Sequence, residues 1–193
     1  MTQIPLFPLN TVLYPGGPLQ LRIFEPRYLE LVSDCLRHGN GFGVCLIRTG
    51  AEVGPAPVPR DVGTLGRISD WEQRRDGLLG ITVIGERRFR LRELQTLPSQ
   101  LLLGEVEYLE QPARTALPER FQPLTELLRR IVEQLDGPYD SLPTAYDEAG
   151  WVSYRLAEIL PLPLAAKQEL LEQDDPLGRL ERIERLISRK AGA

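Results

Sequence analysis

An acid and a base flank a proline in the stretch LRIFEPRY, where Glu25, Pro26 and Arg27 follow directly on apolar residues. A carboxylate and a guanidinium this close together could exchange protons with a substrate or bind its charged groups. The triplet is also typical of a corner between a strand and a helix, because proline presets the first helical turn and a carboxylate is favoured at a helix N-terminus. We interpret it as a structural corner, in which Phe24 and Tyr28 hold the helix against the rest of the fold and Arg27 pairs with Glu25 or another acid.

Two cysteines and the single histidine have spacings that could suit a metal ion. Two residues separate Cys35 from His38, and Cys45 could supply a third ligand. Both cysteines nevertheless occupy apolar patterns, where a free thiol behaves as a small buried hydrophobe, and a fourth ligand is not evident. We therefore expect no metal and no cofactor, two reduced cysteines, and His38 at a helix C-terminus, where a cation is favoured.

The residues needed for nucleophilic or nucleotide chemistry are sparse. Lys167 and Lys190 are the only lysines, neither follows a glycine-rich phosphate loop, and Lys167 has no serine one helical turn away. No GxSxG motif is present, and His38 is the only histidine that could activate a serine. The sequence thus favours a protein that is not an enzyme, while an activity on a small molecule stays open.

The densest run of charge in the chain is ERRFRLR, at residues 86–92. Alternate residues of a strand point to the same face, which groups three of these arginines together: Arg88, Arg90 and Arg92. Such a face could bind phosphate or carboxylate groups. Glu105 and Glu107 alternate in the next strand pattern and could neutralise it through cross-strand pairs. We favour the ion-pair ladder, because the net charge of −4 argues against a nucleic-acid partner.

Loops with aromatic and proline residues form a weaker candidate for binding. Tyr14 lies between Leu13 and Pro15, and residues 56–59 read APVP. Loops of this kind suit contacts with proteins or peptides when they are exposed. The candidate binding residues are therefore Tyr14 and the three arginines of the predicted face.

The elements that must position these residues begin with short β-type runs broken by glycine and proline. One helical pattern interrupts them at 26–38, opened by a proline and followed by a glycine. Strand patterns at 64–73 and 78–96 flank the turn signal RRDG, and Gly85 marks a bulge or bend. We expect residues 1–112 to form a small barrel or folded sheet with one helix.

Residues 113–193 change to helical periodicity. Four apolar stripes follow, which we interpret as helices: 121–135, 151–160, 164–173 and 176–187. The sequence therefore predicts an α+β fold, with a β-rich unit at 1–112 and a helical unit at 113–193.

The composition is that of a soluble globular protein, with 42% hydrophobic and 26% charged residues among 193. No apolar run approaches the length that spans a membrane, and the opening residues MTQIPLFPLN lack the basic region of a signal peptide. We therefore expect a cytoplasmic protein without a membrane partner.

The run from residue 5 to 32, which contains IFEPRY, resembles the opening of the N-terminal substrate-binding domain of Lon proteases. Further matching segments follow in the same order: FGVCLI, VGTLGRI, DGLLGITVIGERRFRL, GEVEYLE and the helical end at 160–187. The resemblance implies a PUA-like pseudobarrel followed by a helical bundle. The chain also resembles stand-alone bacterial Lon-domain proteins, which lack the ATPase and protease modules. It is similar as well to the Lon-like part of cereblon, without the zinc domain of that protein.

The resemblance implies a non-enzymatic module that binds unfolded or partner polypeptides, with a link to protein quality control. It supplies no catalytic residues. The alternative is an RNA-binding PUA-like domain, in which Arg88, Arg90 and Arg92 would contact phosphates.

Overall fold

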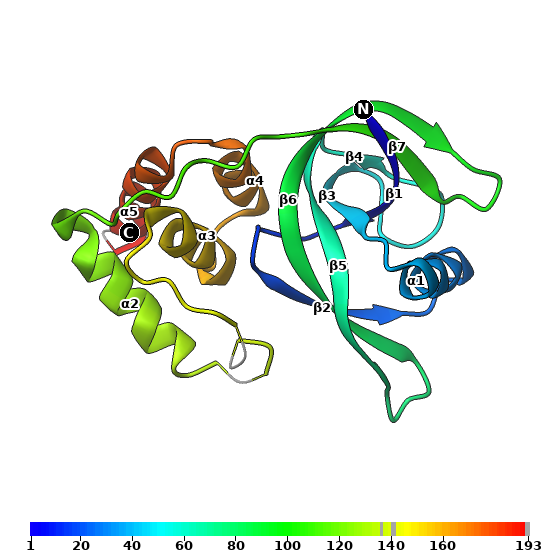
Figure 1. Ribbon diagram of the computed structural model, residues 1–193, viewed down its shortest axis with the longest axis horizontal. Coiled ribbons are helices and arrows are strands. Elements are labelled where there is room, and N and C mark those ends of the chain that lie inside the picture. The colour runs from blue at the N-terminus through cyan, green and yellow to red at the C-terminus, as the bar shows by residue number, and fades with distance from the viewer. Residues whose placement is uncertain (136, 140–141, 192–193) are drawn as a thin grey trace. The chain divides into compact units, whose positions relative to one another are not determined.

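The structure is a computed structural model that describes residues 1–135, 137–139 and 142–191, with side chains as far as residue 188 (Figure 1). Its contacts divide the chain into two compact units, Met1–Glu110 and Gln111–Ala193. The first unit is a β-sheet with one helix and the second is helical, so the predicted α+β class is confirmed.

Seven strands build the first unit. They are β1 (Thr2–Leu9), β2 (Pro18–Ile23), β3 (Phe42–Thr49), β4 (Val58–Pro59), β5 (Val62–Gln73), β6 (Leu79–Thr96) and β7 (Leu102–Tyr108). Five of them follow one another in the order β1-β7-β6-β5-β3, and a parallel pairing of β1 with β3 closes this path into a ring (Figure 1). β2 pairs with β6 outside the ring path, and β4 pairs with β3. The ring confirms the predicted pseudobarrel.

Strand β6 forms a hairpin with β5 and bends where the sequence predicted a bulge. The turn passes through Gly77, whose φ of 82° is left-handed. Between the pairs Thr64↔Arg88 and Gly66↔Gly85, two residues of β6 lie opposite one residue of β5. A bulge of this kind increases the local twist, which lets one long strand take part in two sides of the ring.

The loop that carries Tyr14 packs directly on this bulge. The backbone N–H of Gly16 donates to the carbonyl of Gly85, and the N–H of Gly85 donates to the carbonyl of Gly17. A Cβ added to Gly85 would lie 2.2 Å from the carbonyl oxygen of Tyr14. The Tyr14 side chain is fully buried, so the prediction that it tips an exposed binding loop is wrong.

Helix α1 (Pro26–His38) has the bounds that the sequence predicted. Pro26 occupies the first turn, and Gly39 ends the helix with a left-handed φ of 69° and an N–H that donates to the carbonyl of Cys35. The buried face of the helix packs in one core cluster with residues of the strands. There the ring of Tyr28 stacks on Phe7, with centroids 3.8 Å apart.

The helical unit contains a short 3₁₀ turn and four helices: η1 (Glu119–Phe121), α2 (Gln122–Val132), α3 (Ala149–Ile159), α4 (Leu164–Glu172) and α5 (Pro176–Ala191). Two carboxylates cap these helices, since Glu148 accepts the N–H groups of Gly150 and Trp151, and Asp175 accepts those of Leu177 and Gly178. Helix α2 ends at Val132, three residues before the predicted end of its apolar stripe.

A buried arginine ties three segments of the helical unit together. The Arg179 guanidinium donates to the carbonyl oxygens of Leu170 and Gln173 and to the hydroxyl of Ser153, at 3.0, 2.6 and 2.7 Å. It also lies over the ring of Tyr154, 3.9 Å from its centroid. Because each donor replaces water with a protein acceptor, the charge is tolerated in the core.

In the described part of the chain, no helix combines the length and the apolar character needed to cross a bilayer.

Candidate functional site

The predicted row of three arginines does not form one exposed face. Arg88 is 2% exposed, whereas Arg90 and Arg92 are exposed. One irregularity of β6 makes Arg92 an extra residue between the pairs Leu91↔Val106 and Glu93↔Glu105, whereas Arg88 and Arg90 keep continuous register with β5 and differ in burial. A bulge re-aims the side chains on either side of it. The three arginines therefore do not form a single phosphate-binding face, which is the less favoured of the two interpretations of this run.

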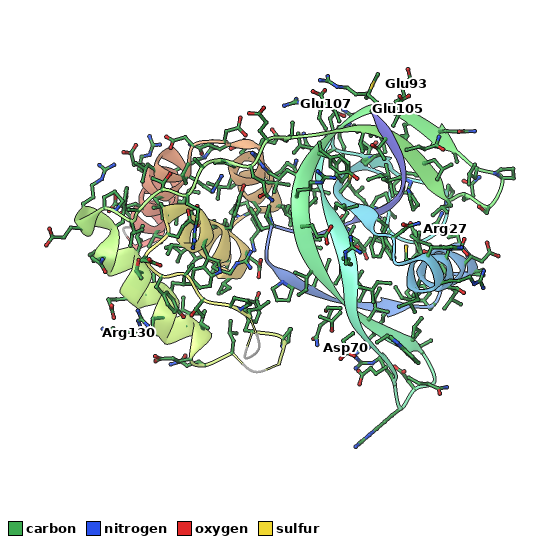
Figure 2. The ribbon with its side chains drawn as sticks, in the orientation of Figure 1. Arg27, Asp70, Glu93, Glu105, Glu107 and Arg130 are labelled. Atoms are coloured by element: carbon green, nitrogen blue, oxygen red, sulfur yellow. The ribbon has the colours of Figure 1, made fainter. Side chains whose placement is uncertain are left out.

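The remaining exposed arginines lie beside acids. Arg92 Nε donates to Glu107 Oε2 at 2.9 Å, and Arg90 pairs with Glu107 across the strands. The hydrogen bond and charge of Arg92, with a smaller effect from Arg90, hold the pKa of Glu107 below its ordinary value. Glu105 lies opposite Glu93, and Figure 2 shows these acids gathered at one edge of the sheet. This surface is balanced or acidic and does not suit a polyanion.

The candidate metal ligands are not brought together. Cys35 and Cys45 are buried in two different core clusters, and burial raises their thiol pKa values to about 11 and about 12. His38 Nδ1 lies 3.0 Å from the carbonyl oxygen of Asp34 in its own helix. Among the described residues, no three His, Cys, Asp or Glu side chains form a group that could hold a metal ion.

Of the two lysines, the structure describes the side chain of Lys167. Lys167 Nζ donates to the main-chain oxygen of Glu158 at 2.7 Å, and burial lowers the lysine pKa. The side chain of Lys190 lies outside the described residues. Lys167 therefore holds a helix end in place.

The acid-proline-base corner contains a buried ion pair. Arg27 Nη2 lies 2.9 Å from Glu25 Oε2, and the Arg27 side chain is 4% exposed. The same guanidinium donates to the carbonyls of Gln100 and Glu52, at 3.1 and 3.5 Å. Glu25 precedes α1 without a side-chain cap, so its carboxylate serves Arg27 and not the helix N-terminus. Arg27 thus joins the corner to two distant loops.

Phe24 does not pack across this corner. Its side chain is 53% exposed, because the chain turns between the end of β2 and Pro26 and directs Phe24 outward. The prediction that Phe24 pins the helix is wrong, whereas Tyr28 is 5% exposed and performs that role.

An apolar hollow of about 250 Å³ opens beside Phe24. Its apolar lining comes from the end of β1, from β2, from α1 and from the loop after β3, and includes Leu9, Leu21, Ile23, Phe24, Tyr28 and Val53. We call it the corner hollow. Phe24 and Val53 are more than half exposed at its rim. Its acids are already engaged, since Glu25 pairs with Arg27 and Glu52 Oε1 accepts the N–H of Asn10 at 2.5 Å.

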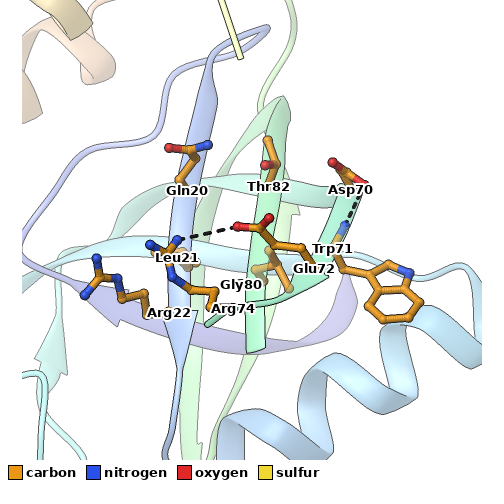
Figure 3. Close-up of a pocket in the computed structure, with 10 residues that line it drawn as sticks. Gln20, Leu21, Arg22, Asp70, Trp71, Glu72, Arg74, Gly80 and Thr82 are labelled. Carbon is orange, nitrogen blue, oxygen red and sulfur yellow. Dashed lines mark hydrogen bonds and ion pairs between the residues drawn. The ribbon is translucent and has the colours of Figure 1, made fainter. Parts of the chain in front are cut away.

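A second hollow, of about 380 Å³, lies over the sheet formed by β2, β6 and β5 (Figure 3). Its lining is polar and carries both signs of charge: Gln20, Arg22, Asp70, Glu72, Arg74 and Thr82. Arg74 Nη1 lies 3.6 Å from Glu72 Oε1, and Asp70 accepts the N–H of Trp71. Trp71 is 59% exposed and points away from the acids in Figure 3. The self-paired charges make this hollow a weaker candidate than the corner hollow.

Comparison with known proteins places both units in one family. The model of the ATP-dependent protease La (LON) substrate-binding domain matches residues 3–189. The Lon protease of Anaeromyxobacter dehalogenans is 25% identical over 97% of this chain, and that of Escherichia coli K12 is 26% identical over 93%. The chain spans about a quarter of the length of these curated relatives, at 23% and 24%.

Solved structures agree. The Lon N-terminal domain protein from Xanthomonas campestris has a TM-score of 0.78 and 39% identity, covering 97% of this chain and 98% of that one. The N-terminal domain of the Mycobacterium avium complex Lon protease shares the fold, with a TM-score of 0.63 at 17% identity over 94% and 96% of the two chains. The chain therefore belongs to the family of the Lon substrate-binding domain.

Proposed function

We propose that this chain is a polypeptide-binding module that recognises unfolded or partner proteins and performs no chemistry of its own. The observation that carries the proposal is the corner hollow, where Phe24 and Val53 stand exposed over an apolar floor. Exposed apolar side chains that rim a hollow are typical of surfaces that bind other proteins. The family name describes a substrate-binding domain, which supports the same reading.

Phe24 and Val53 can contribute only a few kcal/mol to the free energy of binding. Burying a large apolar side chain completely contributes roughly 1.5–3 kcal/mol, and both rim residues are already partly covered. The expected affinity is therefore weak, in the micromolar range, which suits a module that samples many polypeptides. A link to protein quality control is part of the proposal, because the curated relatives are proteases.

Among the described residues, no observation favours RNA binding. Of the arginines predicted to contact phosphates, Arg88 is buried and Arg92 is hydrogen-bonded to Glu107.

The test is equilibrium binding of the whole chain to a permanently unfolded protein, reduced and carboxymethylated α-lactalbumin, followed by fluorescence anisotropy. We expect micromolar binding that changes little between low and high salt, because the contact is apolar. Native α-lactalbumin is the control and is expected to bind more weakly. Absence of binding to the unfolded form, or tighter and strongly salt-dependent binding to a single-stranded RNA, would overturn the proposal.

A further inference from the structure

Strand β2 has a free edge. It pairs with β6 in continuous register from Pro18↔Ile84 to Ile23↔Leu79, and no second strand pairs with it among the described residues. Every second residue of such an edge presents its main-chain N–H and C=O away from the sheet. β2 can therefore accept another strand.

Other open edges of this sheet carry features that discourage strand addition. The edge strand β4 has two residues, one of them Pro59, and an irregular register. The outer parts of β5 and β6 contain irregularities near Asp70 and at Arg92, and they carry several charges. Bulges, prolines and charges are the usual protections of free edges. Residues 19–23 of β2 have no proline and no bulge, although Arg22 adds one charge.

The corner hollow lies along this free edge. Four consecutive residues of β2 line it: Gln20, Leu21, Arg22 and Ile23. Consecutive residues of a strand point to opposite faces, so a hollow that touches all four follows the edge of the strand and not one face. The main chain of β2 and the apolar rim residues Phe24 and Val53 therefore face the same space.

The charges and the volume of the corner hollow indicate which class of ligand it can bind. The carboxylates beside it are engaged by Arg27 and by the N–H of Asn10, so it offers no unengaged carboxylate to a cationic ligand, and its lining carries one cation, Arg22. Its volume of about 250 Å³ is below the roughly 300–1,000 Å³ of small-molecule pockets. A free backbone edge beside an apolar hollow matches an extended polypeptide with one large apolar side chain.

We propose that a bound polypeptide adds to the free edge of β2 as an extended strand and places one apolar side chain between Phe24 and Val53. The inference rests on the proposed polypeptide-binding function and names its mode of recognition. Main-chain hydrogen bonds are the same for every sequence, whereas the hollow selects an apolar residue at one position. This combination explains how one weakly apolar surface recognises unrelated unfolded chains.

The test uses a short synthetic peptide of threonines around a single phenylalanine, which fixes the register through the hollow. Two isomers carry N-methyl groups on alternate residues, one on the odd positions and one on the even positions. In strand addition, only alternate peptide N–H groups point toward β2. We expect one isomer to bind the whole chain about tenfold more weakly than the other, since it cannot form the main-chain hydrogen bonds to β2 that the other isomer retains. Amide hydrogen exchange in residues 18–23 slows when the unmodified peptide binds.

The alternative outcomes separate the two proposals. Equal binding of the two methylated isomers, whether strong or weak, would overturn strand addition and leave polypeptide binding standing. Failure of both the unmodified peptide and unfolded α-lactalbumin to bind would overturn polypeptide binding and the inference with it. If exchange in 18–23 slows with rising protein concentration in the absence of peptide, a second copy occupies the edge and strand addition by a client is wrong.

Discussion

Two regions of the molecule are organised around a buried arginine, one in each compact unit. Arg27 joins the corner before α1 to the carbonyls of two loops, and Arg179 joins three segments of the helical unit. Both arginines use several donors of one guanidinium to bridge segments distant in sequence. The two guanidinium groups form the same kind of hydrogen-bonded bridge, but the exposure of the side chains around them differs.

The surroundings of Arg179 are closed, whereas those of Arg27 are open. Leucines beside Arg179, such as Leu170 and Leu180, are fully buried. Next to the corner of Arg27, Phe24 and Val53 remain more than half exposed. Among the described residues, every large hydrophobic side chain that is exposed lies in the β-rich unit, apart from Leu164. The comparison indicates that Arg179 supports the architecture of the helical unit, whereas Arg27 supports the corner beside the proposed binding surface.

Removal of the closed arginine gives the largest expected effect. Arg179→Ala leaves three buried acceptors without donors, at roughly 1–3 kcal/mol each before relaxation, so we expect a loss of about 3–5 kcal/mol in the free energy of unfolding. Urea denaturation followed by circular dichroism measures it. Arg182→Ala on the same helix removes a partly exposed arginine paired with Glu169 and should cost less than about 1 kcal/mol. Equal losses in the two variants would contradict the role of Arg179 as the buried bridge of the helical unit.

The second largest loss of stability is expected where the loop that carries Tyr14 packs on β6 at Gly85. Gly85→Ala places a Cβ 2.2 Å from the main-chain oxygen of Tyr14, which forces the loop off β6, and we expect a loss of about 2–3 kcal/mol. Gly80→Ala on the same strand is the matched control. Its Cβ meets flexible side-chain atoms of Glu72 and Arg74 at 3.2–3.3 Å, so a loss below about 1 kcal/mol is expected. Thermal unfolding compares the two, and a larger loss in Gly80→Ala would contradict the packing described for Gly85.

The open corner should lose less stability when its counter-charge is removed. Glu25→Gln keeps the shape of the side chain but leaves the buried Arg27 with carbonyl acceptors alone, and we expect a loss of about 1–2 kcal/mol. Asp34→Asn breaks an exposed pair with Arg37 and should change stability by less than about 0.5 kcal/mol. Chemical denaturation of both variants measures the difference. If Glu25→Gln were as neutral as Asp34→Asn, the corner would not depend on its ion pair.

Local signals in the sequence were sufficient to predict the position of several structural elements. Pro26 and the glycine after His38 set both ends of α1, because each acts through its own backbone geometry. Gly85 predicted an irregularity in β6 for the same reason. The two-part α+β order also followed from a change in apolar periodicity.

The exposure of the candidate site could not be predicted from the same signals. Tyr14 is buried by contact with β6, about seventy residues later in the chain. Arg88 is buried although it shares a face of β6 with the exposed Arg90, and the extra residue Arg92 leaves the alternation at a bulge. Phe24 belongs to an apolar run, yet the turn into α1 directs it to solvent. Each outcome depends on tertiary register, which no local pattern reports.

The proposed role of the corner hollow is tested most directly by Phe24→Ser and Val53→Ser, each measured in the whole chain for unfolding free energy and for affinity to unfolded α-lactalbumin. Leu94→Ser is the matched control, since Leu94 is 42% exposed and lies on β6 outside the hollow. We predict roughly tenfold weaker binding for each rim variant, with unfolding free energies within about 0.5 kcal/mol of the unmodified protein. Unchanged binding in both rim variants, or an equal loss in Leu94→Ser, would contradict the assignment of the binding surface to the corner hollow.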